Sequence, residues 1–110
     1  MCGICGIKVI NPILFQTRID DWVELCAKTM LRGRDGFGYA VNGEVIEKVL
    51  GDLPSKNLDK VFTNLKAGDV FISNSRAAPV TEGSVKVENI HPFANDYWAC
   101  LLYTSDAADE

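Results

Sequence analysis

The chain has 110 residues, of which 47% are hydrophobic, and a formal net charge of -4 at pH 7. This length allows one folding unit, and a mildly acidic charge without a lysine or arginine cluster argues against a nucleic-acid surface. Because no apolar run approaches the roughly 18 residues that span a bilayer and the amino terminus lacks a signal-peptide pattern, we expect a cytoplasmic protein that binds neither nucleic acid nor membrane.

The first elements are a strand and a helix. Residues 2–10 are apolar and rich in β-branched side chains, which predicts a buried strand that ends at Asn11. Apolar residues at helical spacing predict a helix over about 19–31, with Thr17 as its cap and Gly33 as its stop. The chain is therefore expected to cross a sheet once and then cover it with a helix.

A hairpin follows. Residues 37–41 and 44–50 are two extended runs separated by Asn42-Gly43, the dipeptide that best fits a two-residue hairpin turn. The sequence therefore predicts two adjacent antiparallel strands.

The next part of the chain predicts a helix, a strand and a loop. Ser55 can cap a second amphipathic helix that ends near Ala67, and residues 70–73 then form a strand. From 76 to 95 the composition becomes irregular and rich in turn residues, which predicts a long surface loop. Long ordered loops often carry function.

The last eleven residues, CLLYTSDAADE, do not continue the residue pattern of the preceding chain. All of 100–110 resembles a translated sequencing adapter, so we expect residues 1–99 to be natural and the tail to be non-native. The alternative is an encoded carboxy-terminal strand with an acidic extension. If the tail is non-native, the natural protein is expected to be longer.

Cys2 is a candidate nucleophile. Removal of Met1 would leave a residue that carries both a thiol and a free α-amino group. An α-amino group has a pKa of about 7.7–8.0, so near neutral pH it can accept the thiol proton without help from a histidine. The alternative is that Cys2 is an ordinary buried residue at the start of a strand.

Three separated stretches carry a family resemblance. They are MCGICGI at the start, RGRDGFG at 32–38, and SRAAP at 75–79 followed by NIHPF at 89–93. Together they resemble the amino-terminal half of class II glutamine amidotransferase domains. The resemblance covers residues 2–99 and implies part of the αββα sandwich of N-terminal-nucleophile hydrolases, an α/β fold with mostly antiparallel sheets.

The resemblance also implies an activity. Cys2 would attack the side-chain amide of L-glutamine and release ammonia, and water would hydrolyse the resulting thioester to glutamate. The ammonia would pass to a synthase domain or subunit, and neither a metal nor an organic cofactor would be needed. The family's Asn-Gly oxyanion pair would follow Ala99, so the 110-residue chain itself is expected to be inactive.

Five further residues receive roles from the resemblance. Arg76 would bind the substrate α-carboxylate, for which a planar guanidinium is well suited, and His91 would lie near the same pocket. Gly3, Arg32 and Asp35 would support the active site. Each role has a simpler alternative: a surface ion pair for Arg76, a structural histidine, and an arginine and aspartate that only hold a turn.

The sequence departs from the family pattern beside the arginine. The histidine often found just upstream is missing, and Asn74 and Ser75 stand in its place. This leaves the mode of substrate binding open.

Two other classes of protein remain as alternatives. One is a non-catalytic or regulatory relative, or an N-terminal-nucleophile hydrolase that acts on another amide. The other is a metal or thiol-redox module, because Cys2 and Cys5 form a C-x-x-C pair. A structural zinc site usually needs four ligands, and only Cys26 and His91 remain outside the tail. Cys5 and Cys26 are more simply explained as core residues.

Overall fold

The computed structural model describes residues 3–77, 86–94 and 99–100. Its elements are β1 (Gly3–Lys8), α1 (Pro12–Gln16), α2 (Ile19–Thr29), β2 (Gly36–Val41), β3 (Glu44–Leu50), α3 (Ser55–Asn64), β4 (Val70–Arg76), the 3-10 helix η2 (Val87–Asn89), β5 (Phe93–Ala94) and β6 (Ala99–Cys100). The described part of the chain is therefore an α/β fold, as the sequence predicts.

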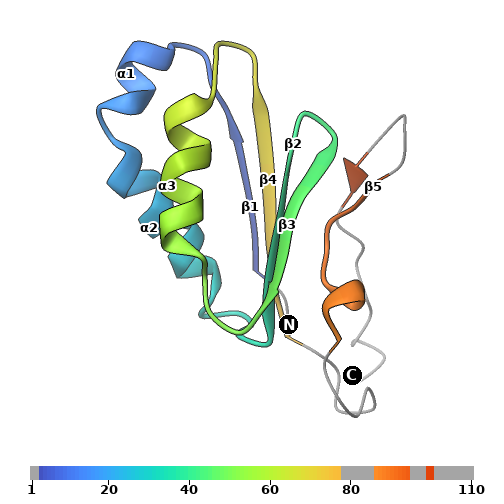
Figure 1. Cartoon of the computed structure of the whole chain (residues 1–110). Coiled ribbons are helices and arrows are strands. Elements are labelled where there is room, and N and C mark those ends of the chain that lie inside the picture. The colour runs from blue at the N-terminus through green and yellow to red at the C-terminus, as the bar shows by residue number, and fades with distance from the viewer. Residues whose placement is uncertain (1–2, 78–85, 95–98, 101–110) are drawn as a thin grey trace.

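Four strands form one sheet in the order β1-β4-β2-β3, and every neighbouring pair is antiparallel. The three α-helices cover one face of this sheet, and β5 lies on the other side (Figure 1). β5 pairs with β6 in a separate two-stranded sheet. The last long strand, β4, thus lies inside the sheet between β1 and β2.

The predicted hairpin is confirmed. Asn42 and Gly43 have φ values of 50° and 86°, the left-handed conformations that a tight hairpin turn requires. The Asn42 side chain also donates to Asp69 Oδ1 (2.9 Å) and accepts from the backbone N–H of Val70 (2.9 Å). The turn is therefore tied to the start of β4.

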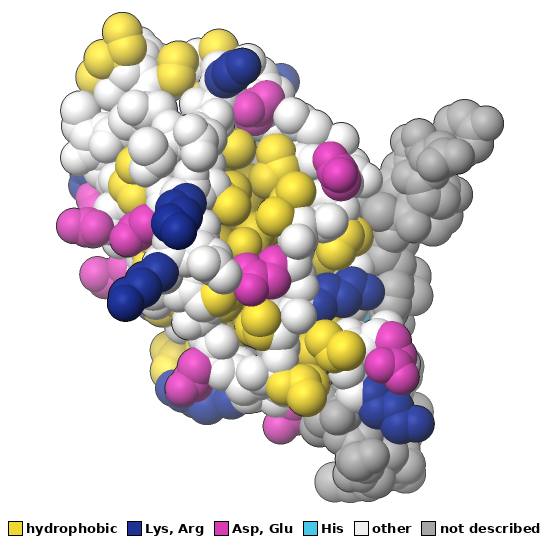
Figure 2. Space-filling view, viewed as in Figure 1, with side chains coloured by type: hydrophobic (Ala, Val, Ile, Leu, Met, Phe, Trp, Pro, Cys, Tyr) yellow, Lys and Arg dark blue, Asp and Glu magenta, His cyan; other side chains and the backbone are white. Residues whose placement is uncertain are grey.

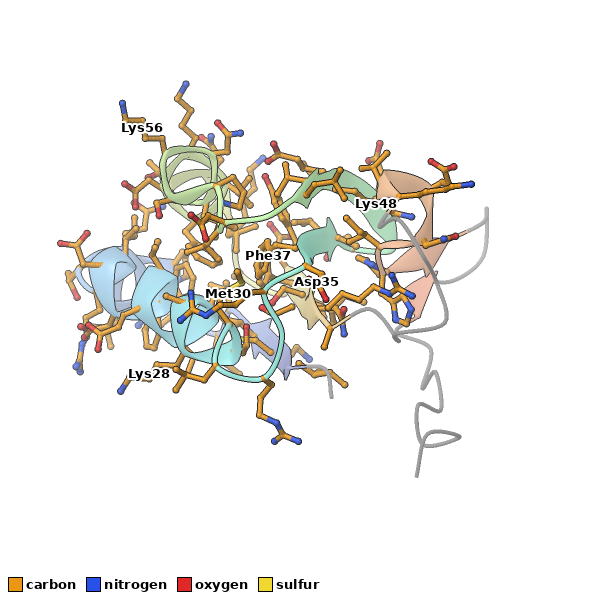
Figure 3. All side chains as sticks on the ribbon, turned by 90° about the horizontal axis from the view of Figure 1, so that it is seen from below. Lys28, Met30, Asp35, Phe37, Lys48 and Lys56 are labelled. Atoms are coloured by element: carbon orange, nitrogen blue, oxygen red, sulfur yellow. The ribbon has the colours of Figure 1, made fainter. Side chains whose placement is uncertain are left out.

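The core lies between the helices and the sheet. In Figure 3, Phe37 of β2 and Met30 at the end of α2 both lie in this layer. The rings of Phe62 and Phe71 are 4.8 Å apart and join α3 to β4. The buried cluster consists of Cys5, Val9, Phe15, Cys26, Met30, Phe37, Tyr39, Leu58, Phe62, Leu65 and Phe71. Burial of each large side chain contributes roughly 1.5–3 kcal/mol.

The region before α2 corrects the sequence prediction. A short helix, α1, was not expected, because Asn11-Pro12 was interpreted only as the end of a strand. Asn11 Oδ1 accepts from the N–H groups of Ile13 (3.1 Å) and Leu14 (3.2 Å) and so caps α1. Thr17 does not cap α2: its Oγ1 donates to the Leu14 carbonyl (2.7 Å) at the end of α1.

The second helix and the strand that follows it have ends that differ from the predicted ones. Ser55 is the first residue of α3 rather than its cap, which is Pro54, and the helix ends at Asn64 instead of near Ala67. β4 continues to Arg76, three residues past its predicted end, because it pairs on both sides with β1 and β2. Pairing between distant strands is not visible in local sequence.

Part of the predicted loop over 76–95 forms secondary structure. Within it the structure shows η2 and β5, while residues 78–85 lie outside the described residues. The predicted non-native tail falls almost wholly at 101–110, which is also outside them. In the described ranges, no helix is both long enough and apolar enough to cross a membrane.

Candidate functional site

Three of the sequence stretches meet at one end of the sheet. Gly3, the first residue of β1, pairs with Ser75 of β4. On the other side of β4, Gly36 pairs with Arg76. The sheet thus brings together the start of the chain, the stretch at 32–38 and the Ser-Arg pair.

Gly3 allows close approach of α2 to β1. A Cβ atom on Gly3 would collide with the backbone oxygen of Thr29, near the end of α2. Thr29 and Ser75 share a hydrogen bond between their hydroxyl groups (2.5 Å). Gly3 thus permits the packing of α2 on β1, and its supporting role in an active site stays a prediction. Cys2, the predicted nucleophile, lies outside the described residues.

The turn that precedes β2 contacts the end of β4 through its main chain. The N–H of Asp35 donates to the Arg76 carbonyl (2.8 Å). A Cβ atom on Gly33 would lie 2.6 Å from the Arg76 carbonyl carbon. The side chains of Arg32 and Asp35 are exposed, and their supporting role stays a prediction.

Arg76 is buried on the sheet face away from the helices. Side chains alternate along a strand, so Asn74 and Arg76 share one face of β4, while Ser73 and Ser75 face the helices. Only 5% of Arg76 is exposed. An exposed surface ion pair, the simpler interpretation of this arginine, does not fit that burial.

His91 lies close to the same face. The residue is buried, and burial, followed by the positive charges of Arg76 and Lys48, lowers the pKa of His91 below its ordinary value. Figure 3 places Lys48 on the side of the sheet away from the helices. The positive charges of Arg76 and Lys48 thus lie close enough to His91 to oppose its protonation.

Two glycines of β2, Gly36 and Gly38, pack directly against residues 90 and 91. A Cβ atom on Gly38 would collide with the carbonyl oxygen of His91, and one on Gly36 would collide with the Ile90 side chain. The absence of a side chain at these two positions thus allows residues 90 and 91 to pack directly against β2.

Asn74 is a site residue that sequence analysis did not identify. The residue is 1% exposed, and in the part of the chain that the structure describes neither Oδ1 nor Nδ2 of its side chain has a hydrogen-bond partner. Its strand neighbours are Ile4 on β1 and Gly38 on β2. The sequence offered one indication of this residue. In the family that the chain resembles, a histidine often lies just upstream of the arginine, and Asn74 and Ser75 stand in its place here.

The core interpretation of Cys5 and Cys26 is confirmed, since both are buried free thiols. A hydrogen bond to Cys5, together with burial, raises the pKa of the Cys26 thiol, while the same bond lowers the pKa of Cys5. Among the described residues, no three His, Cys, Asp or Glu side chains are grouped so that they could hold a metal ion.

Comparison with known proteins finds two archaeal relatives. The chain is 32% identical over 103 residues to 7-cyano-7-deazaguanine synthase 2 of Sulfurisphaera tokodaii and, with the same identity and length, to 7-cyano-7-deazaguanine synthase of Saccharolobus solfataricus. Each alignment covers 87% of this chain and 22% of the relative. The chain thus spans about a fifth of the length of these relatives. No family model and no solved structure match it.

These relatives correct the activity expected from sequence. Both are named as synthases of 7-cyano-7-deazaguanine, and neither is named as a glutaminase or an N-terminal-nucleophile hydrolase. The prediction of glutamine hydrolysis is therefore wrong on this comparison. The short motifs that suggested it cover few positions, whereas the alignments extend along most of the chain.

Proposed function

We propose that the chain is a segment of a longer enzyme related to the 7-cyano-7-deazaguanine synthases. The observation that carries this proposal is the similarity to two named synthases along 87% of the chain. Because the chain corresponds to only 22% of each relative, the rest of the polypeptide would complete the enzyme and would be the first partner of this segment. Residues 1–99 would be its natural part.

Within that enzyme, the end of β4 would bind a small anion. Arg76 is buried beside His91, and Lys48 adds a second positive charge. A guanidinium can bind a carboxylate through two parallel hydrogen bonds, and partial burial strengthens the attraction. Gly3 would hold the strand end, and Cys2, its chain neighbour, would supply a reactive thiol to the same site.

The turn residues Arg32 and Asp35 would fix the position of Arg76. The support for this role is the main-chain bond from Asp35 to the Arg76 carbonyl. This bond would tie the position of the turn to that of the strand end. A change in the turn would therefore alter binding at Arg76 without removing a binding group.

The remainder of an αββα sandwich is also a proposal. The helices occupy one side of the sheet, and β5 lies on the other (Figure 1). The exposed apolar residues Ile4 and Val70 lie on that other face, over β1 and β4. A second sheet that begins with β5 and β6 and continues in the longer polypeptide would cover them.

The experiment is to express the complete reading frame and to measure 7-cyano-7-deazaguanine by mass spectrometry. We expect the product with the unaltered protein and a loss of at least about tenfold in Arg76→Lys, which keeps the charge but not the planar fork. Arg18→Lys is the matched control, because Arg18 is exposed and pairs only with Asp21 among the ion pairs found in the described residues (2.7 Å). Absence of product, or equal activity of the two variants, would contradict the proposal.

A further inference from the structure

Cys5 of β1 and Cys26 of α2 form a pair of thiols outside the candidate site. Both are free cysteines, 6% and 0% exposed, and they share a hydrogen bond. Ser73, which pairs with Cys5 across the sheet, donates from Oγ to the Cys26 sulfur (4.0 Å). The two sulfur atoms therefore meet in the core layer between the helices and the sheet.

The packing of α2 on β1 fixes this meeting point. Near the end of α2, Thr29 lies so close to β1 that a Cβ atom on Gly3 would collide with its backbone oxygen. Thr29 also shares a hydrogen bond with Ser75, the residue opposite Gly3. Cys5 lies two residues after Gly3, and Cys26 lies three residues before Thr29. The close spacing of the two main chains therefore continues to the thiol pair, and the sulfur atoms are held by a helix and a strand.

Two thiols in contact can be joined by a disulfide with little rearrangement. The S–S bond has a length of about 2.05 Å, so the two sulfur atoms need only approach from contact to bonding distance. A fold that holds two thiols together also raises their effective concentration, which favours the internal disulfide at a given redox potential. The unfolded chain must instead pay the entropy of closing a loop of about 20 residues.

We propose that Cys5 and Cys26 are an oxidation site at which a disulfide joins β1 to α2. The oxidant is a low-molecular-weight disulfide such as oxidised glutathione. One protein thiolate attacks a glutathione sulfur, breaks the glutathione disulfide, releases one glutathione and forms a mixed disulfide. The second protein thiolate attacks the protein sulfur of that mixed disulfide, forms the internal S–S bond and releases the second glutathione. The two protein thiols lose two electrons and two protons, which the two glutathione molecules take up.

The thiols are accessible to glutathione before the chain has folded. Both side chains are buried once α2 has packed on β1, so the exchange takes place before that packing or during its transient opening. The bond is then enclosed in the core, where a reductant does not reach it. This inference depends neither on the proposed anion site nor on the reaction of the longer enzyme.

The test uses the Cys2→Ser, Cys100→Ser chain, in which Cys5 and Cys26 are the two remaining thiols. The reduced protein is equilibrated with mixtures of oxidised and reduced glutathione, once in buffer and once in concentrated urea, and is quenched with acid. Mass spectrometry measures the fraction that has lost about 2 Da, the mass of two hydrogen atoms. We expect an equilibrium constant for the disulfide at least about tenfold larger in buffer than in urea. Peptide mapping of the unaltered chain should find the same link between Cys5 and Cys26.

A matched control moves one thiol by a single residue. In the double variant Cys26→Ala, Ala27→Cys the loop keeps almost the same length, but the thiol takes the place of Ala27, which is exposed. We expect similar equilibrium constants in buffer and in urea for this variant. If it forms the disulfide as readily as the Cys5–Cys26 pair does, loop closure alone explains the bond and the inference is overturned.

The melting temperature gives a second measurement. Because the disulfide closes a loop of about 20 residues, we expect the oxidised protein to melt at least about 8 °C above the reduced protein. Reduction in denaturant, followed by refolding, should abolish this difference. An oxidised protein that melts below the reduced one, or that carries bound glutathione in place of the internal bond, would show that the sulfur atoms are not placed for bonding.

Discussion

The carbonyl oxygen of His91 occupies the space that a side chain on Gly38 would need. This contact sets the distance between β2 and the segment that carries His91. It also explains why a strand in the middle of the sheet tolerates a residue that is unfavourable in strands.

Substitution of Gly38 by alanine should therefore destabilise the protein. The added methyl group must displace backbone rather than a flexible side chain, so we expect a loss of about 1–3 kcal/mol in the free energy of unfolding. Gly6→Ala is the matched control, since the same methyl group would meet no described atom there. Urea denaturation of both variants measures the difference, and equal stabilities would show that residues 90 and 91 do not rest on β2.

Stability should fall when the solution is acidified through the range in which histidine titrates. Burial lowers the pKa of His91 in the folded chain, so the unfolded chain, with a pKa of about 6.5, takes up a proton first. The contribution of neutral His91 is complete above that value and is lost as the pH decreases toward the folded pKa.

His91 is the one histidine of the chain, which makes the assignment direct. Thermal melts between about pH 7.5 and 5.5 should show decreasing stability for the unaltered protein and a flatter profile for His91→Gln. A profile with the same slope in both proteins would exclude His91 as the source.

The two core thiols should resist alkylation in the folded protein. Cys5 and Cys26 are buried, and the thiol of Cys26 has a raised pKa, so neither combines access with reactivity. Mass spectrometry after iodoacetamide treatment should find little modification at Cys5 and Cys26 in the folded protein and full modification of both in denaturant. Rapid modification of Cys26 without denaturant would contradict its place in the core.

The contact between α3 and β4 should dominate the stability of the core. Phe62 is fully buried, and its ring lies 4.8 Å from that of Phe71. We expect Phe62→Ala to lower the free energy of unfolding by about 3–5 kcal/mol. Ile13→Ala provides the comparison, because Ile13 belongs to the exposed apolar side chains near α1, where Figure 2 shows hydrophobic atoms at the surface. Similar losses in both variants would contradict the packing of α3 on β4.

Local sequence predicted the elements that depend on local physics. Asn42-Gly43 predicted the hairpin because few other residues adopt its left-handed turn, and Cys26 was placed in the core by the apolar stripe of its helix. The same reasoning missed α1, because Asn11 was interpreted as the end of a strand although it also caps a helix.

The candidate site depends on contacts between distant parts of the chain. Gly3 and Arg76 were both predicted as site residues, but only the pairing of β1 with β4 places them at one end of the sheet. The sequence marked Asn74 only as a departure from the family pattern, because the lack of hydrogen-bond partners for its side chain among the described residues is visible only in the fold. The expected activity was wrong because short motifs were given more weight than similarity along the chain.

The proposal that this chain is a segment of a longer synthase-type enzyme is tested most directly by sequencing the source DNA beyond the codon for Ala99. We predict that the natural reading frame departs from the sequence CLLYTSDAADE and continues to a protein several times longer, similar along its length to the 7-cyano-7-deazaguanine synthases. A frame that encodes all of Cys100–Glu110 and then stops would contradict the proposal.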